Sequence, residues 1–237
     1  MAVQQHKRGI AATAVACVTG LAVAACGGSG GDPLADMSAK QVVSKAVSDL
    51  KAAPTFGLSG RVTEPGGDLT LHIDYKRRTG CEGTIAQAGK GSFTLVVVGT
   101  TAWVKPDDAF WRAYAGSDAS QAIALFSGRY LKGSTTNANV ASLTQLCDVN
   151  TLTSQLSVPT DVVKGKVTTL GGQQVVPLTD KAKGGTLYVT DTSSPQIVEL
   201  VNTTAGNSGK VTFMVGKPVT VTAPPASESI DGSSFGF

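Results

Sequence analysis

The sequence of 237 residues is short of histidine, of aromatic residues and of net charge, and each shortage narrows the possible functions. His6 and His72 are its two histidines, so neither a histidine-rich metal site nor a histidine relay is well supported. A net charge of +3 is too small for the basic surface that binds nucleic acid. The sequence has no P-loop, dinucleotide-binding or EF-hand motif, and we expect no cofactor and no metal.

The N-terminus has the pattern of a secretory signal. Lys7 and Arg8 precede an apolar stretch from Ile10 to Ala25, which is shorter than the about 20 strongly apolar residues of a membrane span. A basic start followed by such a stretch is typical of a signal peptide. We therefore expect residues 1–25 to be removed on export.

The stretch Leu21-Ala22-Val23-Ala24-Ala25-Cys26 resembles a bacterial lipobox. The resemblance implies acylation of Cys26, cleavage before it, and a mature protein anchored by lipid to the extracytoplasmic face of the cell membrane. The glycine-rich residues 27–31 that follow suit a flexible tether, which we place at residues 26–37. The alternative is an ordinary signal peptide with an accidental cysteine.

Counting cysteines predicts one disulfide. Cys17 leaves with the signal and Cys26 takes the lipid, so Cys81 and Cys147 remain in an oxidising compartment. A metal or redox pair is the alternative, but it lacks both C-x-x-C spacing and a nearby histidine.

Hydrophobic periodicity changes along the mature chain. After Ser38, a plausible N-cap, apolar residues follow a helical period up to Leu50, and Pro54 ends that helix. From Gly57 the period becomes two, as in Leu69-Thr70-Leu71-His72-Ile73-Asp74-Tyr75, which is typical of a strand with one apolar face. Beyond these come predicted strands at 58–62, 81–85, 92–98, 101–105, 162–170, 173–178, 186–190, 197–202, 210–214 and 219–222, and helices at 119–131 and 140–147.

These elements predict an α+β fold in which a single curved antiparallel sheet forms a half-barrel of about 9–11 strands. A few helices pack on its concave face. We assign this half-barrel domain to residues 38–222 and expect the Pro- and Ser-rich residues 223–237 to form a frayed tail. With 28 glycines, many threonines and valines and only 5% aromatic residues, the composition favours strands and turns over helices.

The sequence resembles the actinobacterial LppX/LprG-type lipoproteins, relatives in shape of the carriers LolA and LolB. The resemblance rests on the lipobox at Cys26, the leading helix, the strand series, and the late segments 210–213 and 216–221. The segment from Phe110 to Asp148 is similar to an uncharacterised subgroup. The family implies a half-barrel that encloses a cavity for acyl chains of lipids or lipoglycans.

Strand alternation suggests which apolar side chains line such a cavity. The candidates are Val62, Leu69, Leu71, Ile73, Phe93, Leu95, Val97 and Trp103. Ordinary core packing is the alternative for each of them. Our first hypothesis is a monomeric, lipid-anchored protein that binds a lipid. The rival is an envelope scaffold with a filled core that docks a partner.

An extracytoplasmic hydrolase is the third hypothesis, and we expect no catalytic residues. Residues 27–31 match G-x-S-x-G formally but have no strand before them. His72, the one histidine outside the signal, falls on the polar face of a strand. Asp107 and Asp108 follow a proline and suit the start of a helix. The basic run Lys76-Arg77-Arg78 is interpreted as a solvated strand end.

Overall fold

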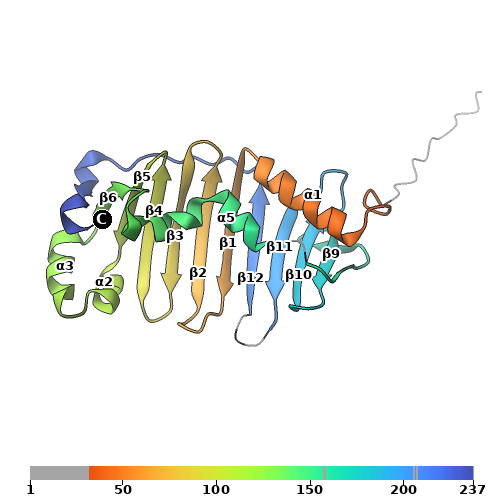
Figure 1. Cartoon of the computed structure of the whole chain (residues 1–237), viewed down its shortest axis with the longest axis horizontal. Helices are drawn as coiled ribbons and strands as arrows, with labels where there is room; N and C mark the ends of the chain where they lie inside the picture. Colours follow the sequence, from red (N-terminus) through yellow and green to blue (C-terminus); the bar gives the residue numbers. More distant parts are fainter. Residues whose placement is uncertain (1–31, 157–158, 205, 207, 237) are drawn as a thin grey trace, which may run out of the picture. The chain divides into compact units, whose positions relative to one another are not determined.

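The computed structural model describes residues 32–156, 159–204, 206 and 208–236. The expected signal peptide, Cys26 and residues 27–31 of the expected tether lie outside this part of the chain. Residues 32–236 are dominated by one curved, unclosed sheet (Figure 1).

Thirteen strands from the described residues make up this sheet. They are β1 Thr55–Val62, β2 Leu69–Lys76, β3 Gly80–Gln87, β4 Gly91–Val98, β5 Thr101–Pro106, β6 Tyr130–Ser134, β7 Val162–Lys164, β8 Thr168–Leu170, β9 Gln173–Asp180, β10 Gly185–Thr190, β11 Ile197–Asn202, β12 Gly209–Val215 and β13 Ser229–Asp231. Their order is β13-β6-β5-β4-β3-β2-β1-β12-β11-β10-β9-β7, with β8 also paired to β9. Only the β13–β6 pair among them is parallel. The predicted half-barrel is confirmed, with more strands than expected.

Five α-helices accompany the sheet in the described residues: α1 Ala39–Ala52, α2 Asp108–Tyr114, α3 Ala119–Phe126, α4 Ala138–Thr144 and α5 Val149–Gln155. Four short 3-10 turns are also present in the described residues. Two of them join helices, η1 Gly116–Asp118 and η2 Gln145–Cys147, and two flank β13, η3 Ala226–Glu228 and η4 Ser233–Phe235. Figure 1 shows α1 and α5 crossing one face of the sheet. That face holds the main core of the protein.

Helix α1 begins where the sequence predicts. The Ser38 hydroxyl accepts the Gln41 amide at 3.3 Å, and the Gln41 side chain accepts the Ser38 amide at 2.8 Å, so two otherwise unpaired N–H groups are satisfied. Val42, Val43 and Leu50 are buried against inner-face residues of the sheet. The apolar stripe of α1 therefore fixes the helix over the concave face.

Two glycines on the inner face of the sheet stand where neighbouring strands leave no room for a side chain. A Cβ at Gly60 would lie 2.2 Å from the Lys210 carbonyl oxygen, and one at Gly83 would lie 2.3 Å from the His72 carbonyl oxygen. No real side chain tolerates such contacts. Glycine at these two positions thus allows the neighbouring backbones to approach closely.

A disulfide links the sheet to the helices above it. Cys81 of β3 and Cys147 of η2 form the predicted bond, with their Cα atoms 5.4 Å apart and a sequence separation of 66. The bond holds the segment α4–η2–α5 against the concave face.

The structure differs from the predicted helix at 119–131. Helix α3 ends at Phe126, Gly128 has a φ of 72°, and Tyr130 starts strand β6. The left-handed glycine ends the helix, and the chain then pairs with β5. The apolar residues on both sides of Gly128 look like one helical stripe in sequence, which is why β6 was not predicted.

The end regions also differ from expectation. Residues 32–37 form turns in which Leu34 is fully buried, and the Lys164 ammonium donates to the carbonyl oxygens of Leu34, Ala35 and Met37. Instead of one strand at 162–170, two short strands, β7 and β8, pair with β9. The predicted strand at 219–222 is irregular backbone.

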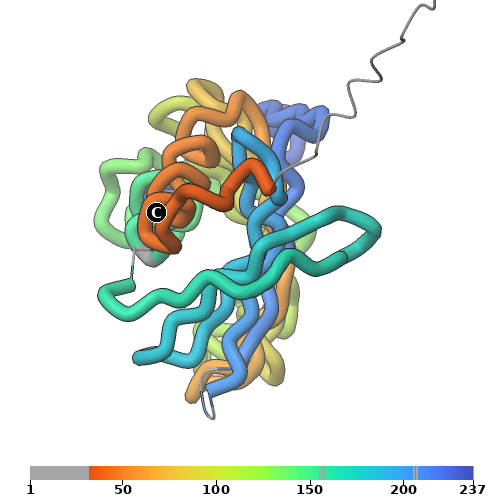
Figure 2. The backbone as a smooth tube through the Cα atoms, turned by 90° about the vertical axis from the view of Figure 1, so that its right-hand side faces the viewer, coloured from red at the N-terminus to blue at the C-terminus, as the bar shows by residue number. Residues whose placement is uncertain are grey.

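The C-terminal residues 216–231 cross to the far end of the sheet. The Thr55 hydroxyl donates to the Lys217 carbonyl at 2.7 Å, and the Lys217 ammonium lies 2.7 Å from the Asp74 carboxylate on the outer face. Beyond residue 223, where we expected a frayed tail, β13 pairs with β6. Figure 2 shows α1 and this C-terminal segment on opposite sides of the sheet.

Candidate functional site

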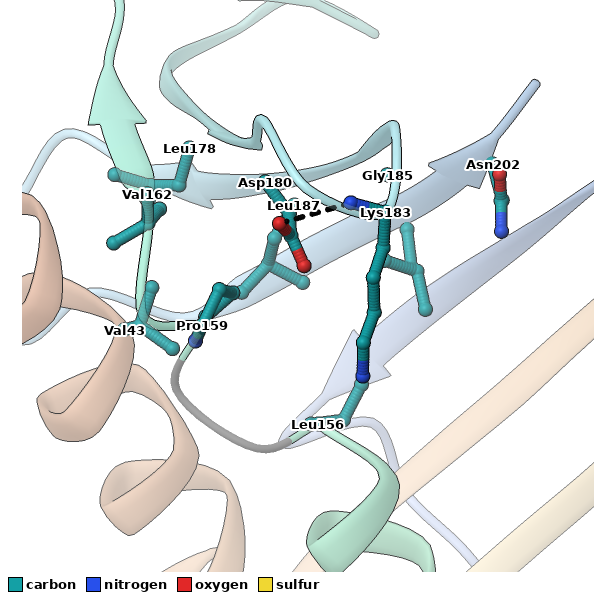
Figure 3. A pocket seen from close by; sticks show the side chains of 11 residues that line it. Val43, Leu156, Pro159, Val162, Leu178, Asp180, Lys183, Gly185, Leu187 and Asn202 are labelled. Carbon is teal, nitrogen blue, oxygen red and sulfur yellow. Dashed lines mark hydrogen bonds between the residues drawn. The ribbon is translucent and has the colours of Figure 1, made fainter. Parts of the chain in front are cut away.

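A cavity of about 190 Å³ opens between the helices and one half of the sheet (Figure 3). Its walls come from α1, from the end of α5, and from strands β7, β9, β10 and β11. The residues that line it are Val43, Leu156, Pro159, Val162, Leu178, Asp180, Lys183, Gly185, Leu187, Leu200 and Asn202.

The cavity is apolar on one side and polar on the other. Val43, Val162 and Leu178 gather on the apolar side (Figure 3). Lys183 and Asp180 stand on the polar side, where the Asp180 carboxylate accepts the Lys183 amide at 3.1 Å and so fixes the turn between β9 and β10. An apolar space with a few fixed polar groups is the usual composition of a small-molecule site.

An apolar row on the inner face continues from this cavity across the sheet. Successive register partners in the row are Leu187, Leu200, Val211, Gly60, Leu71, Ile85 and Phe93. Leu187 and Leu200 line the cavity, whereas Leu71 and Phe93 are half-buried at the other end. We call this set the inner row. The inner row joins the cavity to the strands on which the cavity-lining residues were predicted from the sequence.

The predicted lining residues occupy three different environments. Ile73, Leu95 and Val97 are buried in the main core on the inner face. Leu69, Leu71 and Phe93 are half-buried and pack against that core. Val62 is also half-buried, at the end of β1 opposite Leu69. None of these residues is part of the lining of the 190 Å³ cavity, so their contact with a ligand stays a prediction.

Trp103 was predicted to line the concave face, but it lies on the opposite face of the sheet. In β5 it alternates with Ala102 and Val104, which belong to the main core. Trp103 instead packs with Val96 and Tyr130 in a separate cluster on the outer face. A residue one position along a strand points to the opposite face, so Trp103 cannot line the concave side.

Sequence reasoning missed the residues that line the cavity on β7 and β9–β11. Strands 173–178, 186–190 and 197–202 were predicted, and the register of β9, β10 and β11 places Leu178, Leu187 and Leu200 on one face. The sequence does not indicate which helix covers these strands. The approach of Val43 and Leu156 to these strands is a tertiary contact that strand alternation does not encode.

The residues considered for catalysis lie on the outer face of the sheet and at the start of a helix. His72 is largely exposed on the outer face, with Nε2 3.8 Å from the Asp74 carboxylate. Ser59 is its register partner on β1, yet no hydrogen bond joins them among those of the described residues. Asp107 is the N-cap of α2, accepting the Phe110 amide at 2.7 Å, as its place after a proline predicted.

Two further features concern possible metal ligands and the hydropathy of the helices. The described part of the chain contains no cluster of three or more histidine, cysteine, aspartate or glutamate side chains that could hold a metal ion. Within the same residues, no helix has the length and apolar content that crossing a membrane requires.

The fold can be compared with known structures. LprF from Mycobacterium bovis superposes with a TM-score of 0.51 over 78% of this chain and 96% of its own, at 13% sequence identity. The chain has the fold of LprF. The lipoprotein LppX from Mycobacterium tuberculosis gives a TM-score of 0.49 over 78% of this chain and 98% of its own, at 14% identity. The match to LprF confirms the resemblance to LppX/LprG-type proteins as a resemblance of fold.

An uncharacterised conserved protein from Thermus thermophilus, at 9% identity and a TM-score of 0.39, covers 81% of this chain and 98% of its own. Searches by sequence found neither a matching family model nor a matching curated protein. The likeness to LprF therefore rests on the comparison of structures and not on sequence similarity.

Proposed function

We propose that this protein is an exported lipoprotein, anchored through Cys26, whose concave face binds the acyl chain of a lipid. The lipobox pattern supports the anchor, and the LprF-like half-barrel supports the binding face. The protein acts by binding rather than by catalysis, as a monomer. The observation that carries the proposal is the inner row, since it runs from the cavity, at Leu187 and Leu200, to a half-buried end at Leu71 and Phe93.

The volume of the cavity limits the length of acyl chain that it can enclose. A cavity of about 150 Å³ holds a benzene molecule, so 190 Å³ takes a short segment of one acyl chain. Burying about six methylenes contributes roughly 5 kcal/mol, which alone corresponds to a Kd of about 0.2 mM. Tighter binding therefore requires the rest of the chain to lie along the inner row. Lys183 and Asn202 on the polar side suit the polar end of the lipid.

The test is native mass spectrometry with lipid extraction. Residues 27–237, secreted behind a cleavable signal, include everything that the structure describes and carry no acyl anchor of their own. We expect stoichiometric lipid to copurify. Leu200→Trp fills the cavity and Leu71→Trp blocks the inner row, so each should abolish the lipid-bound mass while the fold survives.

Thr70→Trp is the matched control, because Thr70 neighbours Leu71 in β2 but is exposed on the outer face. Near-ultraviolet circular dichroism would check that all three variants fold. Lipid retained by both Leu200→Trp and Leu71→Trp would contradict binding on the concave face.

A second candidate is an envelope docking protein that uses the outer face of the sheet. It is favoured by the cavity volume, about 190 Å³, which lies below the roughly 300 Å³ at which ligand pockets usually start. A clean ligand-free mass from several expression hosts would support this candidate. Hydrolase activity that is lost in His72→Ala would instead support an enzyme.

A further inference from the structure

A second cavity, of about 430 Å³, lies between the end of α1, the β2–β3 turn and the disulfide. Four cationic side chains line it: Lys51, Lys76, Arg77 and Arg78. Asp148 is the one acidic residue in the lining. The lining therefore carries a net charge of +3, whereas residues 26–237 together carry 18 basic and 17 acidic side chains, a net +1. Positive charge is concentrated at this site.

These cations are not neutralised by the protein. In the described part of the chain none of the four lies within 4 Å of a carboxylate. The Asp148 carboxylate accepts hydrogen bonds from the Asn150 amide at 2.8 Å and from the Thr151 hydroxyl at 2.9 Å. Like charges held together without counter-ions repel each other, and an anion bound between them relieves that repulsion.

Arg77 is held in place for such a contact. Its Nη1 donates to the Ala52 carbonyl oxygen at 2.9 Å, at the end of α1, and its backbone amide donates to the Pro54 carbonyl at 2.9 Å. A guanidinium has five N–H donors in a fixed plane, so four remain for a ligand. That geometry matches two oxygens of a phosphate group.

Arg78 provides an independent observation. Its φ of 65° is the one left-handed backbone conformation at a non-glycine position among the described residues. Glycine adopts this conformation without strain, whereas an arginine does not. A bulky cation kept at a strained turn beside a cavity is the kind of feature found at ligand sites.

We propose that the cavity lined by Lys51, Lys76, Arg77 and Arg78 binds a phosphate group. The group belongs either to a phospholipid headgroup or to a soluble phosphate ester. The end of α1, the β2–β3 turn and the start of α5 all line this cavity, and arginine and lysine side chains around an open space bind phosphate oxygens. This site is separate from the acyl-chain cavity, and its test does not depend on acyl-chain binding.

The experiment titrates residues 27–237 with inorganic phosphate at constant ionic strength and follows backbone amide shifts by NMR. We expect saturable shifts of residues 76–80 and 148–150. The double variant Arg77→Gln/Arg78→Gln should weaken phosphate binding at least about tenfold, because charge-assisted hydrogen bonds are lost. The control Lys40→Gln/Lys166→Gln removes the same charge from exposed positions outside the cavity and should change the affinity less than about twofold.

A second experiment distinguishes a phospholipid headgroup from a soluble phosphate ester as the ligand. Sedimentation with vesicles of phosphatidylcholine, or of phosphatidylcholine and phosphatidylglycerol in equal parts, measures lipid headgroup binding. Phosphate-competed binding to the anionic vesicles supports the headgroup; phosphate binding without vesicle binding supports a soluble ester. Shifts that do not saturate, or an equal loss of affinity in both double variants, would overturn the proposal.

Discussion

The Tyr75 hydroxyl donates a hydrogen bond to the Leu146 carbonyl oxygen, one residue before the disulfide cysteine Cys147. Tyr75 and Cys81 are register partners on β2 and β3, so the two links lie side by side. Desolvation by burial raises the pKa of Tyr75 well above its usual range, so the phenol remains a donor at physiological pH. Together the two links fasten the α4–η2–α5 segment to the inner face.

We expect the disulfide to be the stronger of these two links. Replacing Cys81 and Cys147 by serine opens a 66-residue loop and should cost about 4 kcal/mol of unfolding free energy. Tyr75→Phe should cost about 1 kcal/mol, the usual value of one hydrogen bond. Urea denaturation measures both. Tyr114→Phe, which removes an exposed hydroxyl bonded to Gln87, is the control and should cost less.

Arg78→Gly should stabilise the fold while weakening phosphate binding. Relief of the left-handed strain is worth about 1 kcal/mol, whereas the lost cation reduces affinity. Arg77→Gly is the matched comparison, and it should destabilise the protein because the hydrogen bond to Ala52 disappears. Urea denaturation and phosphate titration of the two variants check this. Equal loss of stability in both would contradict strain at Arg78.

Substitutions at Trp103 and at Leu71 should have different effects on stability and on lipid binding. Trp103→Ala empties a buried cluster on the outer face and should cost about 3–5 kcal/mol without changing the lipid-bound mass. Leu71→Ala removes a half-buried side chain from the inner row, so it should cost less stability but reduce lipid retention. Urea denaturation and native mass spectrometry together measure both effects. Loss of lipid in Trp103→Ala alone would argue for a site on the outer face.

Because the pKa of Asp191 is raised in the folded protein, we expect the free energy of unfolding to fall as the pH rises. Burial, followed by a hydrogen bond and charge repulsion from Asp32, raises the pKa of Asp191 above its ordinary value of 3.8. The folded protein then keeps a proton that the unfolded chain releases. This stability is fully present below pH 3.8 and is lost as pH rises through the raised pKa.

Asp191→Asn should therefore remove the pH dependence in that window and stabilise the protein most above it. Urea denaturation at a series of acidic pH values measures the change. The exposed residue Asp161 provides the control substitution Asp161→Asn. The interpretation fails if the two variants follow the same pH profile.

The fold was predictable where strands alternate clearly. In β2 the apolar residues Leu69, Leu71 and Ile73 share the inner face with Tyr75, as the sequence predicts. Alternation fails in β5, where Ala102, Trp103 and Val104 are all buried because both faces are covered. A continuous apolar run does not indicate which residue points inward.

Sites formed by distant segments were not predictable. The Lys76-Arg77-Arg78 run was interpreted as a solvated strand end, since nothing in the sequence places Lys51 beside it. The α1 helix brings Lys51 there by packing on the concave face, a contact between residues far apart in sequence. Amphipathic periodicity predicts which face of α1 is buried but not where along the sheet the helix ends.

The unclosed sheet has two edges, and both are short. At one edge β13 spans Ser229–Asp231, and at the other β7 spans Val162–Lys164, with β8 equally brief beside it. Three-residue edges present few unpaired amide and carbonyl groups to a neighbouring chain. Proteins held on a membrane meet their copies at high local density in two dimensions. Such edges would let a half-barrel remain open for a ligand without adding strands from its neighbours.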